Sequence, residues 1–208
     1  MAKLGMKSLV RPKKYRSYKG EVGQAAANVL QRQFEAKAAN QKWVTDVREF
    51  DVAGEKLYLS PVMDLYNGEI VAFETAKRPV FKLVSSMLQK ALSKPMLQKA
   101  LSKLRTDDKP MLHSDQGWEY RMPAYQRILR QRGMEQSMSR KGNCLDNAAM
   151  ESFFAVLKTE FFYLNKFSSV DELQTGIKKY IHYYNHDRIK LKLKGLSPVQ
   201  YRTQPLAT

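Results

Sequence analysis

The patterned part of the chain opens with three short runs that are rich in β-branched and aromatic residues. They lie at 43–47, 57–64 and 70–73, with turns expected at Ala53-Gly54 and Asn67-Gly68. An Asn-Gly pair accepts the positive φ angles that a tight hairpin needs, and runs of this composition favour strands. We therefore expect a three-stranded antiparallel meander.

The spacing of apolar residues becomes helical after Pro79, where Phe81, Val84, Leu88 and Leu92 predict a helix. The elements expected further on are a strand at 110–114, a helix at 123–132 that Gly133 ends, a strand at 134–138, a loop at 139–143, a helix that Asp146 caps and that runs to 162, and a helix that Ser168 caps and that runs to 184. The sequence thus predicts an α/β fold in which helices flank a five-stranded mixed sheet with an antiparallel edge.

The net charge of +16 is concentrated toward the two ends of the chain. Residues 1–40 hold nine Lys or Arg and two acidic residues, and residues 178–202 hold seven and one, with tyrosines between them. Clustered cations and aromatics favour a nucleic acid partner over a basic surface that serves only solubility. We divide the chain into a basic N-terminal arm or linker (1–40), a core (41–165), and a C-terminal helix and basic tail that complete the core (166–208).

A single cysteine, Cys144, excludes a disulfide scaffold and a thiolate site for structural zinc, and it fits a reducing compartment. No apolar run approaches the roughly 18 residues that a membrane span needs. Basic residues stand where a signal peptide would have its apolar stretch. We therefore expect a soluble cytoplasmic protein with no membrane partner.

Three acidic residues stand where they could converge. Asp46 lies in the middle of the first run, where Asp is disfavoured; Asp115 follows the strand at 110–114; and Glu151 lies one turn into a helix. Clustered carboxylates repel unless cations neutralise them, and oxygen ligands suit Mg²⁺ or Mn²⁺. Two such ions about 3.5 to 4 Å apart promote phosphodiester displacement. Alternatively, Asp46 is a satisfied strand residue and Glu151 an ordinary first-turn acid.

Residues around these acids are candidates for DNA contacts. Asn147 and Lys158 stand four before and seven after Glu151, on one face of the helix, and Arg140 and Lys141 lie on the loop that precedes it. Three further residues have two interpretations each: His113 as a proton relay or a locally hydrogen-bonded histidine, and Trp118 and Tyr120 as base-stacking or packing residues.

The residues as a set resemble a known family. Thr45-Asp46, the segment 113–117 and the segment 147–154, with 35 residues between Asp115 and Glu151, are similar to the D, D(35)E signature of the retroviral-integrase-like transposases. Lys158 matches the basic residue of that signature, and the blocks 180–185 and 196–198 resemble the family's C-terminal part. The chain is most similar to the OrfB transposases of bacterial insertion sequences. The resemblance implies a ribonuclease H-like fold, with Asp46, Asp115 and Glu151 as catalytic metal ligands.

The resemblance also implies an activity. A transposase core of this kind would use two Mg²⁺ ions, with Mn²⁺ as a substitute, to cleave a DNA strand with water and to transfer it through a 3′-hydroxyl. Its expected partners are insertion-sequence ends, target DNA, further copies of the chain and a companion DNA-binding subunit, at the nucleoid of a bacterium. Two alternatives stay open: a hydrolytic ribonuclease H-like nuclease, and a truncated, non-catalytic DNA-binding regulator.

Two features depart from the family pattern. Residues 1–10 resemble only the end of a helix-turn-helix segment that precedes the core in relatives, so the arm is interpreted as its remnant. The segment Met87–Lys94 recurs at 96–103. A shift of nine residues, at about 100° per residue, turns the second copy to the opposite side of a helix. We therefore expect a break in the helix near Lys94 and Pro95.

Overall fold

One mixed sheet organises the protein. The structure is a computed structural model that describes residues 23–93 and 110–204. The strands of the sheet are β1 (Lys42–Thr45), β2 (Arg48–Val52), β3 (Glu55–Asp64), β4 (Ile70–Ala76), β5 (Met111–Ser114) and β6 (Glu135–Met138). Strand β3 pairs antiparallel with β1, β2 and β4, whereas β1, β5 and β6 are parallel neighbours. The expected mixed sheet with an antiparallel part is therefore confirmed.

The sheet has one strand more than the sequence predicted because β1 ends at Thr45, within the predicted run 43–47, and a separate strand, β2, begins at Arg48 beyond that run. Strands β1 and β2 both pair with the same side of β3, through Val62–Asp64 and Glu55–Leu59 respectively. Ser60 and Pro61 of β3 lie opposite the break, where no ladder hydrogen bond is needed, and a proline has no backbone N–H to donate there. Asp46 is consequently not a mid-strand residue, as the sequence suggested, but the first residue beyond β1.

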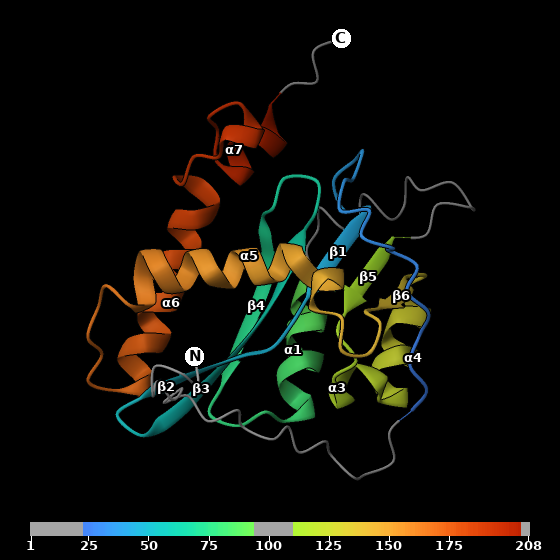
Figure 1. Cartoon of the computed structure of the whole chain (residues 1–208), viewed down its shortest axis with the longest axis horizontal. Helices are drawn as coiled ribbons and strands as arrows, with labels where there is room; N and C mark the ends of the chain where they lie inside the picture. Colours follow the sequence, from blue (N-terminus) through green and yellow to red (C-terminus); the bar gives the residue numbers. More distant parts are fainter. Residues whose placement is uncertain (1–22, 94–109, 205–208) are drawn as a thin grey trace, which may run out of the picture.

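Helices cover both faces of the sheet. They are α1 (Phe81–Leu92), α3 (Trp118–Arg121), α4 (Pro123–Gln131), α5 (Ala148–Leu157), which continues as a π-helical turn at Lys158–Phe162, α6 (Val170–His186) and α7 (Pro198–Thr203). Short 3₁₀ turns lie at Cys144–Asn147 and Leu191–Leu193. Helices α5 and α6 lie on one face, and α1, α3 and α4 on the other (Figure 1).

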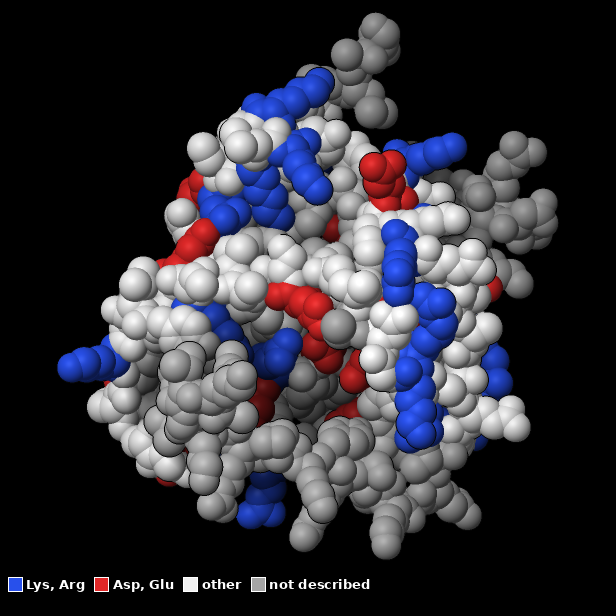
Figure 2. All heavy atoms as spheres, in the orientation of Figure 1, with Lys and Arg blue, Asp and Glu red and all other residues white. Residues whose placement is uncertain are grey.

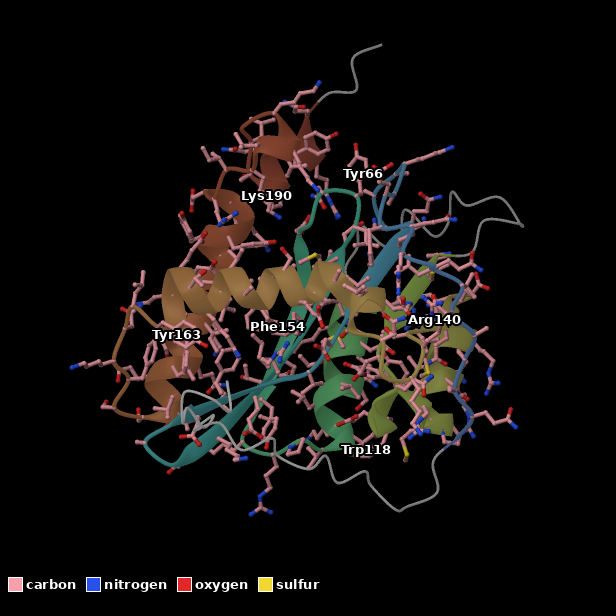
Figure 3. The ribbon with its side chains drawn as sticks, viewed as in Figure 1. Tyr66, Trp118, Arg140, Phe154, Tyr163 and Lys190 are labelled. Atoms are coloured by element: carbon pink, nitrogen blue, oxygen red, sulfur yellow. The ribbon has the colours of Figure 1, made fainter. Side chains whose placement is uncertain are left out.

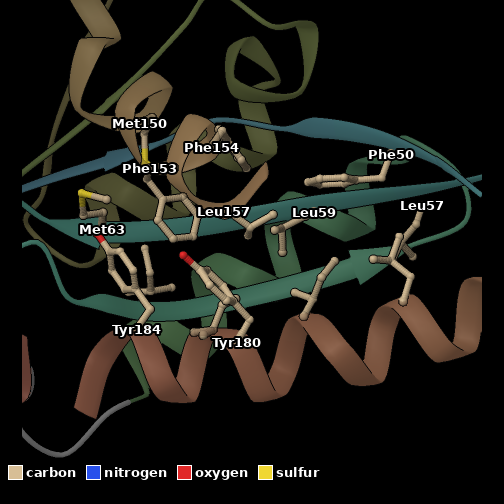
Figure 4. Packing of buried hydrophobic residues seen from close by; sticks show 14 of the residues in the cluster. Phe50, Leu57, Leu59, Met63, Met150, Phe153, Phe154, Leu157, Tyr180 and Tyr184 are labelled. Carbon is tan, nitrogen blue, oxygen red and sulfur yellow. The ribbon is translucent and has the colours of Figure 1, made fainter. Parts of the chain in front are cut away.

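The core consists of two apolar layers, one on each face of the sheet. Val44 belongs to the layer beneath α5 and α6, and its neighbour Trp43 to the layer beneath α1 and α4. This alternation follows from the period of two along a strand. Figure 4 shows aromatic and aliphatic side chains of α5 and α6, among them Phe153, Leu157 and Tyr180, packed against the sheet.

One helix end lies at the expected residue and another lies one residue away. Gly133 adopts φ +66°, and the N–H groups of Gly133 and Met134 donate to the carbonyls of Arg130 and Leu129, which is the Schellman pattern. The cap of α6 is one residue later than expected: Ser169 Oγ accepts from the Glu172 N–H, while Ser168 contacts the Glu172 carboxylate.

Helix α1, which contains residues 87–92 of the first copy of the repeat, ends at Leu92, with Ser93 as its C-cap. The expected break at Lys94 and Pro95 and the second copy of the repeat lie outside the described residues. Within the described ranges, every helix is too short or too polar to cross a membrane.

Part of the segment 23–40, interpreted from the sequence as arm or linker, packs along β6 through residues 26–30. Val29 and Leu30 donate their N–H groups to Ser137 Oγ, and Ala27 accepts from the Met138 N–H. The side chain of Leu30 is only 1% exposed and belongs to the core layer beneath α5 and α6. This segment therefore covers the free edge of the sheet at β6.

We expect Leu30→Ala to lower the free energy of unfolding by about 2 to 5 kcal/mol, because it leaves a cavity in a closed core. Val29, the residue before it, is 40% exposed, so Val29→Ala should change stability by about 0.5 kcal/mol or less. Urea unfolding of both variants measures the difference. Equal stabilities would mean that 23–40 is a linker that contributes nothing to the core.

Candidate active site

Two carboxylates lie side by side at the carboxyl ends of neighbouring parallel strands. Asp46 follows β1 and Asp115 follows β5, and each stands two residues beyond the paired residues Val44 and His113. Parallel pairing without a bulge therefore places the two acids level with each other. Both line a pocket of about 390 Å³.

Backbone amides orient the two carboxylates. The Val47 N–H donates to Asp46 Oδ1 at 2.8 Å, and the Gly117 N–H donates to Asp115 Oδ1 at 2.9 Å. A Cβ at Gly117 would lie 3.0 Å from Asp115 Oδ1 and 2.8 Å from Glu119 Oε2, so a side chain there would force these carboxylates to shift. Glycine at this position therefore lets two acidic side chains approach the same stretch of backbone.

The electrostatics of the site disfavour the charged form of both acids. Burial, with the nearby negative charge of Asp115 as the next cause, raises the pKa of Asp46 to about 7. Burial also raises the pKa of Asp115, although the Gly117 N–H and the charge of Arg121 partly offset it. Among the described residues neither carboxylate forms a salt bridge. The negative charge of the site is thus offset only in part, by Arg48 near Asp46 and by Arg121 near Asp115.

The third predicted acid, Glu151, approaches the pair from α5. It is half-buried, and its charge contributes to the raised pKa of Asp46, though less than that of Asp115. It does not line the 390 Å³ pocket, and in the described ranges no three His, Cys, Asp or Glu side chains are arranged to hold one ion. The structure therefore brings Asp46 and Asp115 together, with Glu151 nearby but not at the same point.

Glu119 is an acid of this pocket that sequence reasoning missed. It is 9% exposed, and burial and the charge of Asp115 raise its pKa. Tyr120 and Trp118 also line the pocket; Tyr120 is 1% exposed and packs edge-on against Tyr125, which fits the packing interpretation. No pattern in the sequence indicated Glu119. Its place in the pocket depends on the short helix α3, which brings the Glu119 carboxylate close to Gly117.

His113 is a structural residue in this arrangement. Its Nδ1 lies 2.8 Å from Ser137 Oγ and its Nε2 lies 3.0 Å from Ser139 Oγ. Burial lowers its pKa to about 4, so the ring is neutral near pH 7. Local hydrogen bonding rather than proton relay is therefore what the structure shows.

The predicted DNA contacts occupy different environments. Lys141 is exposed, whereas Lys158 is half-buried with its ammonium 5.8 Å from the centre of the Phe50 ring. Burial and the nearby Arg48 lower the pKa of Lys158. Arg140 lies on the loop beside the start of α5 (Figure 3), and its guanidinium contacts both carboxylate oxygens of Asp146.

Two expectations about this helix start need correction. Asn147 is 5% exposed, and its Nδ2 donates to the Thr45 carbonyl at 3.1 Å, so it faces β1 and not the surface. Asp146 does not cap α5, because its carboxylate is bound by side chains from elsewhere in the chain; the N-cap position is Asn147, without a side-chain cap bond. Figure 2 shows acidic atoms in a hollow near the centre of this face, with Lys and Arg atoms on both sides.

Comparisons with known proteins agree with this fold. Models of the integrase core domain match residues 36–144 and 151–206. The putative transposase InsK of insertion sequence element IS150 of Escherichia coli is 54% identical over 98% of this chain and 69% of its own length. An uncharacterized transposase-like protein of Haemophilus influenzae is also 54% identical, over 98% of this chain and 89% of its own.

Solved structures show the same architecture. The chain matches a subunit of the simian T-cell lymphotropic virus intasome with a TM-score of 0.67 and 16% identity, over 91% of this chain and 62% of that one. It matches the HTLV-2 integrase catalytic core domain, solved in complex with magnesium, with a TM-score of 0.56 and 16% identity, over 80% of this chain and 99% of that one. The fold is therefore of the ribonuclease H-like, integrase-core type.

These findings define the class first: the chain belongs to the integrase core domain family, whose members are polynucleotidyl transferases. The 54% sequence identity to InsK and to the transposase-like protein of Haemophilus influenzae then identifies the kind of polynucleotidyl transferase. The chain is a DNA transposase catalytic core of the insertion-sequence type.

Proposed function

We propose that Asp46, Asp115 and Glu151 are the catalytic residues, and that they hold two Mg²⁺ ions for which Mn²⁺ can substitute. The observation that carries this proposal is that Asp46 and Asp115 stand level with each other in one pocket and form no salt bridge among the described residues. Their donor atoms are all carboxylate oxygens, which fit Mg²⁺ and Mn²⁺. The magnesium complex of the HTLV-2 core supports the choice of metal.

The residues of the chain would contribute in distinct ways. Hydrogen bonds from the N–H groups of Val47 and Gly117 fix Oδ1 of each aspartate, and in the described part of the chain Oδ2 of each accepts no hydrogen bond. Glu151 adds a carboxylate from the opposite side, on the helix that crosses above the strand ends. A bound divalent ion supplies acidification of the attacking hydroxyl and charge stabilisation of the leaving oxygen.

The DNA-facing part of the proposal rests on the basic residues near this site. Arg140, Lys141 and Lys158 are proposed phosphate contacts, whereas buried Asn147 is not. We propose insertion-sequence ends and target DNA as the substrates, further copies of the chain as partners, and a companion DNA-binding subunit. A bacterial cytoplasm with association to the nucleoid follows from such substrates.

The experiment that tests the reaction uses a pre-cut oligonucleotide duplex. With Mg²⁺, a duplex that ends in a 3′-hydroxyl should be joined to target DNA, whereas the same duplex with a 2′,3′-dideoxy end should not, because the attacking oxygen is missing. Gel electrophoresis of labelled products measures both. Shortened fragments without joined products would favour the hydrolytic nuclease, and DNA binding with neither product would favour the non-catalytic regulator.

A further inference from the structure

We propose that Asp146 and Asn147 are positioning residues, which together clamp the start of α5 and thereby set where Glu151 stands relative to Asp46. Asp146 binds the segment 23–34 and the loop 139–143, and Asn147 binds the end of β1. This inference rests on the proposed function, because it takes Glu151 as a metal ligand.

Asp146 forms the outer half of the clamp. Its side chain is fully buried, and both oxygens are saturated with hydrogen bonds. Oδ1 accepts from Arg32 Nε at 2.8 Å and from Arg140 Nη2 at 3.0 Å. Oδ2 accepts from Asn28 Nδ2 at 2.9 Å and from the Nε and backbone N–H of Arg140, each at 3.0 Å. One carboxylate thus joins residues more than a hundred positions apart to the loop before α5.

The hydrogen bonds from Arg140 hold the pKa of the Asp146 carboxyl well below its usual range. The group therefore stays ionised in every buffer in which a transposase would be assayed. Asp146 therefore acts by holding its hydrogen-bond partners in place, and not by changing its protonation state.

Asn147 forms the inner half. Its Nδ2 donates to the carbonyl of Thr45, the last residue of β1 and the neighbour of Asp46. Thr45 is also held from the other side, since its Oγ1 donates to the Pro61 carbonyl at 2.8 Å. Asn147 Oδ1 is buried and has no donor among the described residues. The bond to Thr45 is thus the polar contact that fixes this amide.

The spacing along α5 connects the clamp to the site. Asn147 and Glu151 are four residues apart, close to the 3.6 residues of one helical turn, so both lie on the face that looks toward β1. A bond from Asn147 to β1 therefore fixes the height of Glu151 above the strand end where Asp46 begins. Without it, the contact between the start of α5 and β1 would be apolar packing alone, which allows small shifts of the helix along the sheet.

A supporting path fixes the other strand. Ser137 Oγ accepts from the backbone of Val29 and Leu30 and also contacts His113, two residues before Asp115. Ser139, at the start of the loop, contacts the other nitrogen of the same ring. The segment 23–34, the loop and the strand of Asp115 are thus parts of one connected polar network, which Asp146 joins to α5.

The test compares Asn147→Ala and Asp146→Asn with Glu160→Gln. Glu160 is a matched control, because Arg188 and Tyr180 bind its carboxylate at the other end of the α5 segment, away from the site. We expect Asn147→Ala and Asp146→Asn to raise the Mg²⁺ concentration for half-maximal strand transfer about tenfold or more, as is usual for residues that orient metal ligands. The KM for DNA should change little in Asn147→Ala, and Glu160→Gln should match the wild type.

Hydrogen–deuterium exchange without metal gives a second readout that does not depend on activity. Asp146→Asn should speed exchange in residues 26–31 and 139–147, and Asn147→Ala should speed it in 147–151, while α6 exchanges as in the wild type. If Asp146→Asn does not fold, Arg32→Gln removes one bond of the clamp from its exposed side and should show the same changes to a smaller extent.

Wild-type Mg²⁺ dependence and exchange in folded Asn147→Ala and Asp146→Asn would overturn the clamp, and so would equal changes in Glu160→Gln. The outcome for Glu151→Gln separates the two proposals. If Glu151→Gln is inactive while Asn147→Ala behaves as wild type, only the clamp fails. If Glu151→Gln is fully active, the proposed catalytic role fails, and the clamp with it.

Discussion

Asp46→Asn, Asp115→Asn and Glu151→Gln are each expected to reduce Mg²⁺-dependent strand transfer a thousandfold or more, which corresponds to about 4 kcal/mol of lost barrier reduction. Each change keeps the size of the side chain but removes an anionic oxygen from the proposed metal site. DNA affinity should stay the same or increase, because each change also removes a negative charge near the phosphate backbone. Joining of a pre-cut duplex and filter binding measure the two effects.

The control is Asp51→Asn, which removes an exposed carboxylate from β2 and should leave activity within about twofold. Glu119→Gln decides the identity of the third acid, because Glu119 lines the pocket of Asp46 and Asp115 whereas Glu151 does not. We expect Glu119→Gln to retain substantial activity. An inactive Glu119→Gln together with an active Glu151→Gln would assign the third ligand to Glu119 instead.

The pairing of Asp46 with Asp115 was predictable because it depends on local patterns. Asp46 stands within one short run of strand-forming residues and Asp115 just after another, and parallel neighbours in a sheet bring such residues together. The break after Thr45 was not predictable from the run itself, in which Val44 and Val47 continue the strand composition. It depends on the partner strand, where Ser60 and Pro61 lie opposite the gap.

The predictions that Asp146 caps α5 and that Asn147 faces the surface were wrong for a related reason. An Asp before a helix has a local use as a cap, and the sequence offers no sign that Arg32 and Asn28 will bind it instead. Residues 23–40 show no apolar periodicity, so their packing along β6 could not be read from spacing. Contacts between residues that are far apart in the chain depend on the assembled fold, and a pattern within one segment does not contain them.

The pKa of Asp46 leads to the second large expected effect, a pH-dependent change in stability. Without metal, the folded protein keeps a proton on Asp46 up to about pH 7, whereas the unfolded chain releases it near 3.8. Between these values the folded state binds more protons than the unfolded state, so the contribution of Asp46 to stability falls as the pH rises from about 4 to about 7. About three pKa units correspond to at most about 4 kcal/mol.

His113 changes stability in the opposite direction over part of this range. The pKa of His113 is about 4 in the folded state and 6.5 ordinarily, so between these pH values the unfolded chain binds more protons at this residue than the folded state. The contribution of His113 to stability therefore rises with pH in this range. In the wild type, the contributions of Asp46 and His113 to stability therefore partly cancel in this pH range. The difference between Asp46→Asn and the wild type isolates Asp46, because both proteins contain the same histidine.

We therefore expect Asp46→Asn, in chelator, to differ little from the wild type in unfolding free energy at pH 4 and to be more stable at pH 8, by an amount that grows mainly between pH 4 and 7. Denaturant unfolding at several pH values measures this difference. Mg²⁺ at pH 8 should stabilise the wild type but not Asp46→Asn, because cation binding favours the ionised carboxylate that burial and Asp115 disfavour. If the difference in unfolding free energy between the two proteins did not change with pH, Asp46 would be ionised throughout this range. A cation would then bind without displacing a proton from Asp46.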